Sequence, residues 1–164
     1  MEKIPLQSAI TSAKQQLRVL ANPELAQKDQ LYFRSTHLFY GISKKEINRI
    51  AKEVKKQSIT PSIDDLLSEL SNLWSSAYHE EKTLGIVLAS LFQEMFDAGH
   101  VQDVFRNWLG DCQSWDHVDE MCICITGQIA LRETHLFDEF VNWSSARSMW
   151  VRRASLISHL PQIR

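Results

Sequence analysis

Two residue pairs in the second half of the chain combine an aromatic ring with a charged group. Trp115 and Asp119 stand four residues apart, and Trp150 and Arg153 stand three apart. On a helix each pair shares one face, so the four side chains could meet in one groove. A carboxylate fixed beside aromatic rings can act electrostatically on a bound ligand, whereas Asp119 paired with Arg153 could equally be a structural contact. The residues alone leave both interpretations open.

Other reactive motifs are absent from the sequence. It holds no His-Glu-x-x-His, Gly-x-Ser-x-Gly or phosphate-loop pattern, which argues against metal hydrolysis, serine-nucleophile chemistry and nucleotide hydrolysis. Its three cysteines form no disulfide framework, and Cys122 and Cys124 are expected to be buried, reduced thiols. His117 is expected to be exposed. The sequence therefore predicts neither a metal site nor a cofactor.

Length and composition indicate one ordinary folded domain. The chain has 164 residues, of which 44% are apolar and 23% charged, and its net charge of −2 favours no particular class of partner. Its apolar runs are far shorter than the roughly 20 residues of a membrane span, and its start lacks the apolar core of a signal peptide. The sequence predicts a cytoplasmic protein with no membrane partner.

Apolar residues recur at helical spacing along the chain, and no segment alternates like a strand. A first helix is expected from about residue 7 to 20, and Asn22 and Pro23 should start a second one that ends near residue 32. Residues 33–42 read as a loop. A capping box formed by Ser43 and Glu46 then predicts a helix, whose buried stripe should be Ile47, Ile50, Ala51 and Val54.

The opposite face of this helix carries a basic row on helical spacing, Lys45, Arg49, Lys52 and Lys56. Charged rows are commonly solvated faces, and they also suit contacts with phosphate groups. The row is compatible with either role.

A repeat begins near residue 60. Trp74, Trp108 and Trp143 are separated by 34 and 35 residues, and each is expected to close one helix shortly before another begins. A period of this length indicates an α-solenoid, in which stacked helix pairs bury one another's apolar faces. We therefore predict an all-α fold of HEAT-like helix pairs, an α-α superhelix that forms one domain over residues 1–164, with residues 1–22 as an N-terminal capping helix.

The repeat also relates Asp119 to equivalent positions in the neighbouring units. Asp119 falls opposite Gly85 and Ala154, so a carboxylate occupies a position that the adjoining repeats keep small. Trp115 falls opposite Trp150 and Glu81, a row that suggests an exposed or groove-lining position.

At these residues the chain resembles a known family, the AlkD-type DNA alkylation repair proteins, which are HEAT-like-repeat DNA glycosylases. The resemblance runs from about residue 31 to 160 and is carried by four segments in order. They are the loop 33–42 that leads into the Ser43 helix, Leu73-Trp74 through His79-Glu80-Glu81-Lys82 to Leu88, Trp115-Asp-His-Val-Asp119, and Trp150-Val-Arg-Arg153-Ala.

The resemblance implies hydrolysis of the N-glycosidic bond of purines alkylated at N3 or N7, on duplex DNA held in a concave basic groove. Asp119 matches the family's catalytic aspartate, Trp115 its groove tryptophan and Arg153 its DNA-contacting arginine. The implied DNA contacts extend over Arg153, Arg152, Trp150, Lys45, Arg49 and Lys52. The implied partner is duplex DNA that carries alkylated bases.

The family's chains continue for at least one further helical repeat, so this chain is expected to be a short or C-terminally truncated member. A second copy of the chain is then an expected partner of the last repeat, through an apolar face left uncovered. The alternative functions are a non-catalytic DNA-binding module and a HEAT-like scaffold for another protein, either of which would have lost activity through the truncation.

Overall fold

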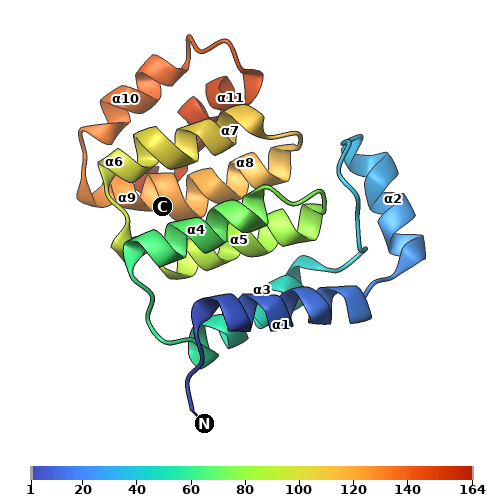
Figure 1. The fold of residues 1–164 in the computed structure, drawn as a ribbon. Helices are drawn as coiled ribbons and strands as arrows, with labels where there is room; N and C mark the ends of the chain where they lie inside the picture. Colours follow the sequence, from blue (N-terminus) through green and yellow to red (C-terminus); the bar gives the residue numbers. More distant parts are fainter. Residues whose placement is uncertain (1, 164) are drawn as a thin grey trace. The chain divides into compact units, whose positions relative to one another are not determined.

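All regular secondary structure in the computed structural model, which describes residues 2–163, is helical (Figure 1). Within that range the extended segments form isolated bridges, such as the one between Leu38 and Tyr78. The predicted all-α fold of packed helix pairs is confirmed. None of the helices in the described part is long and apolar enough to cross a membrane.

Contacts divide the chain into two compact units, an N-terminal unit of Met1–Leu91 and a C-terminal unit of Phe92–Arg164. The organisation of residues 1–164 as one repeat domain stays a prediction. The helices of the N-terminal unit are α1 (Leu6–Val19), α2 (Pro23–Phe33), α3 (Lys44–Gln57), α4 (Ile63–Trp74) and α5 (His79–Leu91). The expected capping helix therefore corresponds to α1, which packs against α3, α4 and α5.

Polar side chains fix the starts of three of these helices. Asn22 accepts hydrogen bonds from the backbone N–H groups of the first turn of α2, and Pro23 occupies the first helical position. Ser43 accepts from the backbone of Glu46 at 3.3 Å and starts α3. Ser62 caps α4 in the same way. The predicted starts after Asn22 and at Ser43 are confirmed.

The core of the N-terminal unit lies around α5, which packs against both α3 and α4. Figure 1 shows α4 and α5 running side by side. The predicted stripe of α3 is confirmed, since all four of its members are buried: Ile47, Ile50, Ala51 and Val54. α5 is buried on nearly every side from His79 to Ala89, as expected for a helix enclosed by neighbours.

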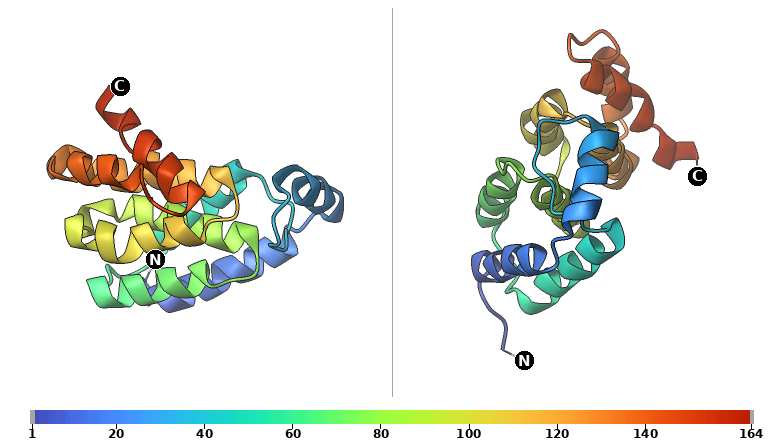
Figure 2. Two further views of the ribbon diagram at one scale, coloured as in Figure 1. Left: turned by 90° about the horizontal axis from the view of Figure 1, so that it is seen from above. Right: turned by 90° about the vertical axis from the view of Figure 1, so that its right-hand side faces the viewer.

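A buried carboxylate holds the predicted loop between α2 and α3. Glu80, which is 2% exposed, accepts hydrogen bonds from the backbone N–H groups of Tyr40 at 3.0 Å, Gly41 at 2.7 Å and Ile42 at 3.2 Å. Gly41 has φ of 76°, and a side chain there would lie 2.4 Å from the backbone of Ala26. Through this loop, Glu80 of α5 holds the end of the segment that follows α2. α2 itself lies beyond the C-terminal end of α1 (Figures 1 and 2).

The neighbouring Glu81 is also enclosed. Its carboxylate pairs with Lys14 at 2.7 Å and accepts a hydrogen bond from the Tyr40 hydroxyl at 2.9 Å. Burial raises the pKa of Tyr40 to about 12. Because Glu81 is 2% exposed, the row that it shares with Trp115 and Trp150 is not exposed throughout, and the expectation was wrong at this position.

The C-terminal unit contains two helical runs, each interrupted by a π-helical turn, followed by a helix pair. Its elements are η1 (Gln93–Met95), α6 (Ala98–His100), η2 (Val101–Phe105), α7 (Arg106–Asp111), α8 (Trp115–Met121), η3 (Cys122–Thr126), α9 (Gly127–Arg132), α10 (Leu136–Trp143), α11 (Met149–Ile157) and α12 (Leu160–Ile163). α11 packs against α7, α8 and α10. Trp108 and Trp143 are buried.

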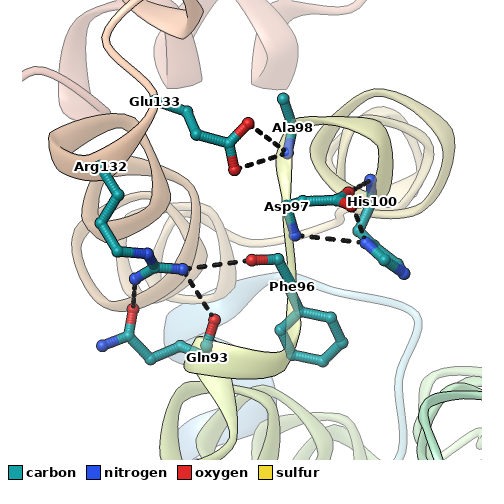
Figure 3. A network of polar contacts seen from close by, with 7 residues as sticks. All are labelled: Gln93, Phe96, Asp97, Ala98, His100, Arg132 and Glu133. Atoms are coloured by element: carbon teal, nitrogen blue, oxygen red, sulfur yellow. Dashed lines mark hydrogen bonds and ion pairs between the residues drawn. The ribbon is translucent and has the colours of Figure 1, made fainter.

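Two residues at the end of α9 tie down the segment that leads into α6 (Figure 3). The Arg132 guanidinium donates to the side chain of Gln93 and to the backbone carbonyls of Gln93 and Phe96. The Glu133 carboxylate accepts from the backbone N–H of Ala98 at 3.2 Å. The two side chains thus hold residues 93–98, which lead into the first helical run, against the end of α9 in the second run.

Gly127 lies at a close approach between the second run and the C-terminal helices. A β-carbon at this position would lie 2.7 Å from the carbonyl oxygens of Cys122 and Ser158 and 2.7 Å from Cγ of Pro161. The Cys122 oxygen belongs to the backbone of the same run, and the Ser158 oxygen to the backbone at the end of α11, so relief requires the backbone itself to shift. We expect Gly127→Ala to lower the free energy of unfolding by about 1–3 kcal/mol in urea titrations.

Gly110 provides the matched control, since a β-carbon there meets no atom within 4 Å. Gly110→Ala in α7 should leave stability unchanged or raise it by about 0.5–1 kcal/mol, because alanine favours helix over glycine. Equal stabilities of the two variants would refute the role assigned to the close approach at Gly127.

Candidate functional site

Asp119 and Arg153 meet within the C-terminal unit, on α8 and α11. Nε and Nη2 of Arg153 donate to the two carboxylate oxygens of Asp119, each at 2.7 Å. The side chains remain 23% exposed for Asp119 and 41% for Arg153. The carboxylate in turn raises the pKa of Arg153. The geometry is the bidentate fork typical of strong arginine–carboxylate pairs, in a place that solvent reaches.

A tryptophan lies about one turn before each of these charged residues. Trp115 is the first residue of α8 and is 44% exposed, an unusual exposure for so large a ring. Trp150 is half-buried in the first turn of α11. The structure thus brings Asp119 and Arg153 into direct contact and places an accessible indole on the helix that carries the carboxylate.

The helix surface beneath Asp119 is a closed, weakly polar interface between the second run and α11. Cys122 is fully buried, with its Sγ atom 4.0 Å from the carbonyl oxygen of Ala154. Burial raises the pKa of the Cys122 thiol to about 12, so it stays protonated and unreactive. The hydroxyl groups of Thr126 and Ser158 hydrogen bond at 3.0 Å. This packing supports the backbone from which Asp119 projects.

The π-helical turn η3 begins three residues after Asp119 in the same run. Turns of this kind add one residue to a helix and occur frequently at functional sites. The apolar spacing of the sequence gives no sign of it. Gly127, whose lack of a side chain leaves room for the Cys122 carbonyl, is the single local signal that could have suggested it.

Two expectations for individual side chains were wrong. His117 is 1% exposed, because it lies on a side of α8 that is buried along with Val118 and Met121. Cys124 is partly exposed rather than buried. All three cysteines are free thiols, as predicted.

The remaining candidates for DNA contact are exposed, and two of them already have partners. Arg152 donates to the backbone carbonyls of Ala146 and Arg147, each at 2.8 Å. Arg49 pairs with Glu46 and Glu53 on α3, each at 2.6 Å, and this contact lowers the pKa of Glu46. Lys45 and Lys52 extend into solvent on the same helix. The basic row of α3 is therefore partly compensated by its own acids.

Comparison with known proteins agrees with these features. A family model described as "DNA alkylation repair enzyme" matches residues 13–164. A solved structure described as a predicted DNA alkylation repair enzyme from Enterococcus faecalis is similar, with 25% sequence identity and a TM-score of 0.75. The match covers 85% of this chain and 65% of that one, so the chain spans about two thirds of the length of this relative. A search of curated proteins gave no significant match. Since the family model covers nearly the whole sequence, the chain belongs to the DNA alkylation repair enzyme family.

Proposed function

We propose that this protein binds duplex DNA and hydrolyses the N-glycosidic bond of purines that carry a positive charge from alkylation at N3 or N7. The observation that carries the proposal is the Asp119–Arg153 pair, fixed by two hydrogen bonds of 2.7 Å yet partly open to solvent beside the exposed Trp115. Membership in a DNA alkylation repair family supports DNA as the substrate.

The chemistry suits a site with a single carboxylate. An N3- or N7-alkylated purine is already cationic, so it leaves with the electron pair of the N-glycosidic bond as a neutral base and needs little acid catalysis. The sugar then carries oxocarbenium character, and a fixed carboxylate such as Asp119 can stabilise that charge. Water adds to C1′ and loses a proton, which completes the hydrolysis. Asp119 could also orient this water.

Arg153 and Trp115 would support the carboxylate in different ways. The bidentate fork of Arg153 holds Asp119 in one orientation, so little reorganisation is needed when charge develops on the sugar. The exposed ring of Trp115 offers a π face on which a cationic base or sugar can lie. Both roles depend on placement rather than on proton transfer.

In this proposal the residues that contact the DNA backbone are Arg153, Arg152, Trp150, Lys45, Arg49 and Lys52. These positions carry positive charge or an aromatic ring and are exposed or half-buried. Arg49 would have to exchange its two glutamate partners for a phosphate, so we expect it to contribute less than Lys45 or Lys52. No metal or cofactor enters the proposal.

Self-association of the last repeat stays a prediction. Exposed apolar side chains lie on α10, α11 and α12 of the C-terminal unit, and they are Val141, Met149, Leu156 and Ile163. A second copy would cover some of these side chains in the proposed arrangement.

The proposal is tested by incubating the 164-residue chain with methylated duplex DNA and quantifying released bases. We expect release of 7-methylguanine or 3-methyladenine above the spontaneous rate. The alternative of a non-catalytic DNA-binding module would give salt-sensitive duplex binding without release. Absence of duplex binding even at low salt would instead favour a protein scaffold.

A further inference from the structure

A second basic feature of the C-terminal unit lies at the start of α11. A cavity of about 440 Å³ opens between α7 and the segment that leads into α11. Its lining comes from two stretches of chain nearly 40 residues apart, and consists of Arg106, Asn107, Gly110, Asp111, Ala146, Arg147, Ser148 and Val151. We refer to it as the arginine cavity.

The two arginines of the cavity, Arg106 and Arg147, are exposed. Neither forms an ion pair or a side-chain hydrogen bond with any residue in the described range 2–163. Asp111 is the one carboxylate among the lining residues, and the first turn of α11 carries no acidic residue. The cavity therefore has a positive balance of charge, in contrast to α3, where two glutamates compensate Arg49.

Arg152 stabilises the rim of this cavity. Its Nη1 atom donates to the carbonyl oxygens of Ala146 and Arg147, each at 2.8 Å, and so fixes the backbone from which the Arg147 side chain extends. The next residue along α11, Arg153, binds Asp119. Two consecutive arginines thus connect the arginine cavity with the proposed catalytic pair through one helix.

Phosphate diesters fit the chemistry of the cavity better than apolar ligands. Guanidinium groups bind phosphate oxygens through paired N–H donors, and arginines without a carboxylate partner lose no existing contact on binding. Asn107 adds an amide at the rim, although its Nδ2 atom already donates to the carbonyl of Asp103 at 2.7 Å. An extended polyanion could reach both this cavity and the Asp119 pair.

We propose that the arginine cavity binds a backbone phosphate of the same DNA duplex whose base reaches Asp119, with Arg106 and Arg147 as its ligands. This inference rests on the proposed function for its choice of polyanion. The contact is a positioning contact, since neither arginine touches Asp119, and it sets affinity and register on the duplex. The chemistry of base release is left to the Asp119 pair.

The test is the salt dependence of duplex binding by Arg106→Gln/Arg147→Gln. With a labelled, unmodified duplex and fluorescence anisotropy between about 50 and 200 mM salt, we expect binding about tenfold weaker at the low-salt end. The slope of log affinity against log salt should fall by about one, since the variant loses one phosphate contact and each such contact contributes about 0.9. Base release at saturating DNA should stay within about twofold of the unchanged chain, as expected for a positioning role.

Lys3→Gln/Lys28→Gln is the matched control, because it removes the same formal charge from exposed positions of the N-terminal unit. Its slope should equal that of the unchanged chain. Equal slopes for the arginine variant and this control would overturn the proposal, and so would a loss of base release at saturating DNA. The binding assay uses unmodified duplex, so it tests the cavity independently of base release. If the chain binds through the cavity but releases no base, the proposed catalytic function alone is contradicted.

Discussion

Asp119→Asn should slow the release of 7-methylguanine from methylated duplex DNA by about 100- to 1,000-fold at saturating DNA. The amide keeps the shape of the side chain but removes the negative charge that faces the sugar cation in the proposed mechanism. Since the leaving base needs little acid catalysis, stabilisation of the sugar cation is the main contribution that this variant loses. Single-turnover assays with radiolabelled methylated DNA measure the effect directly.

The same variant separates the catalytic interpretation from the purely structural one. A partly exposed ion pair contributes about 0–1 kcal/mol to stability, so Asp119→Asn should change the free energy of unfolding by no more than that. Asp103→Asn is the control, because Asp103 is an exposed aspartate of the same unit. A release rate that stays within about threefold of the unchanged chain, with the fold intact, would contradict the assigned role.

Glu80→Ala should lower the free energy of unfolding by about 3 kcal/mol or more, the largest effect on stability that we expect from one substitution. The change removes the acceptor for three backbone N–H groups, those of Tyr40, Gly41 and Ile42. Each buried donor left without an acceptor costs about 1–3 kcal/mol. A domain of ordinary stability, about 5–15 kcal/mol, loses a large share of its margin.

Urea titration followed by circular dichroism measures this loss, and Glu80→Gln keeps the experiment informative if the alanine variant does not fold. Glutamine retains one carbonyl acceptor, so its effect should be about half as large. Glu94→Gln, at an exposed position, should change stability by less than about 0.5 kcal/mol. A Glu80→Ala variant as stable as that control would contradict the role of the carboxylate in holding the loop.

Local signals predicted most of the helical framework from sequence. Asn22 and Ser43 cap their helices in the structure because a short polar side chain satisfies the first N–H groups of a helix, and this effect depends on neighbours in sequence. The stripe that contains Ile47 and Ile50 follows from helical periodicity in the same way. The pairing of Asp119 with Arg153 could be offered as one interpretation of the sequence, because the repeat relates the two helices that carry them.

Features that depend on distant residues were not predictable. The contact of Glu80 with residues 40–42 joins positions about 40 apart in the chain. The local sequence around Glu80 indicates only an acidic residue in the first turn of a helix. His117 looked like a surface residue, since polarity does not reveal which side of a short helix turns inward. The arginine cavity combines residues from successive repeats, and Arg106 carried no local signal.

The π-helical turns η2 and η3 bear on how a repeat of this kind can change in length. One extra residue in a regular helix rotates every later side chain by about 100° and would move a buried residue out to solvent. A π-turn absorbs that residue within five positions, so the helix beyond it keeps its buried face. Both runs of the C-terminal unit contain such a turn, one before Trp108 and one after Asp119. The unit can therefore differ by a residue from a strict repeat period while each tryptophan and the carboxylate keep the faces they occupy.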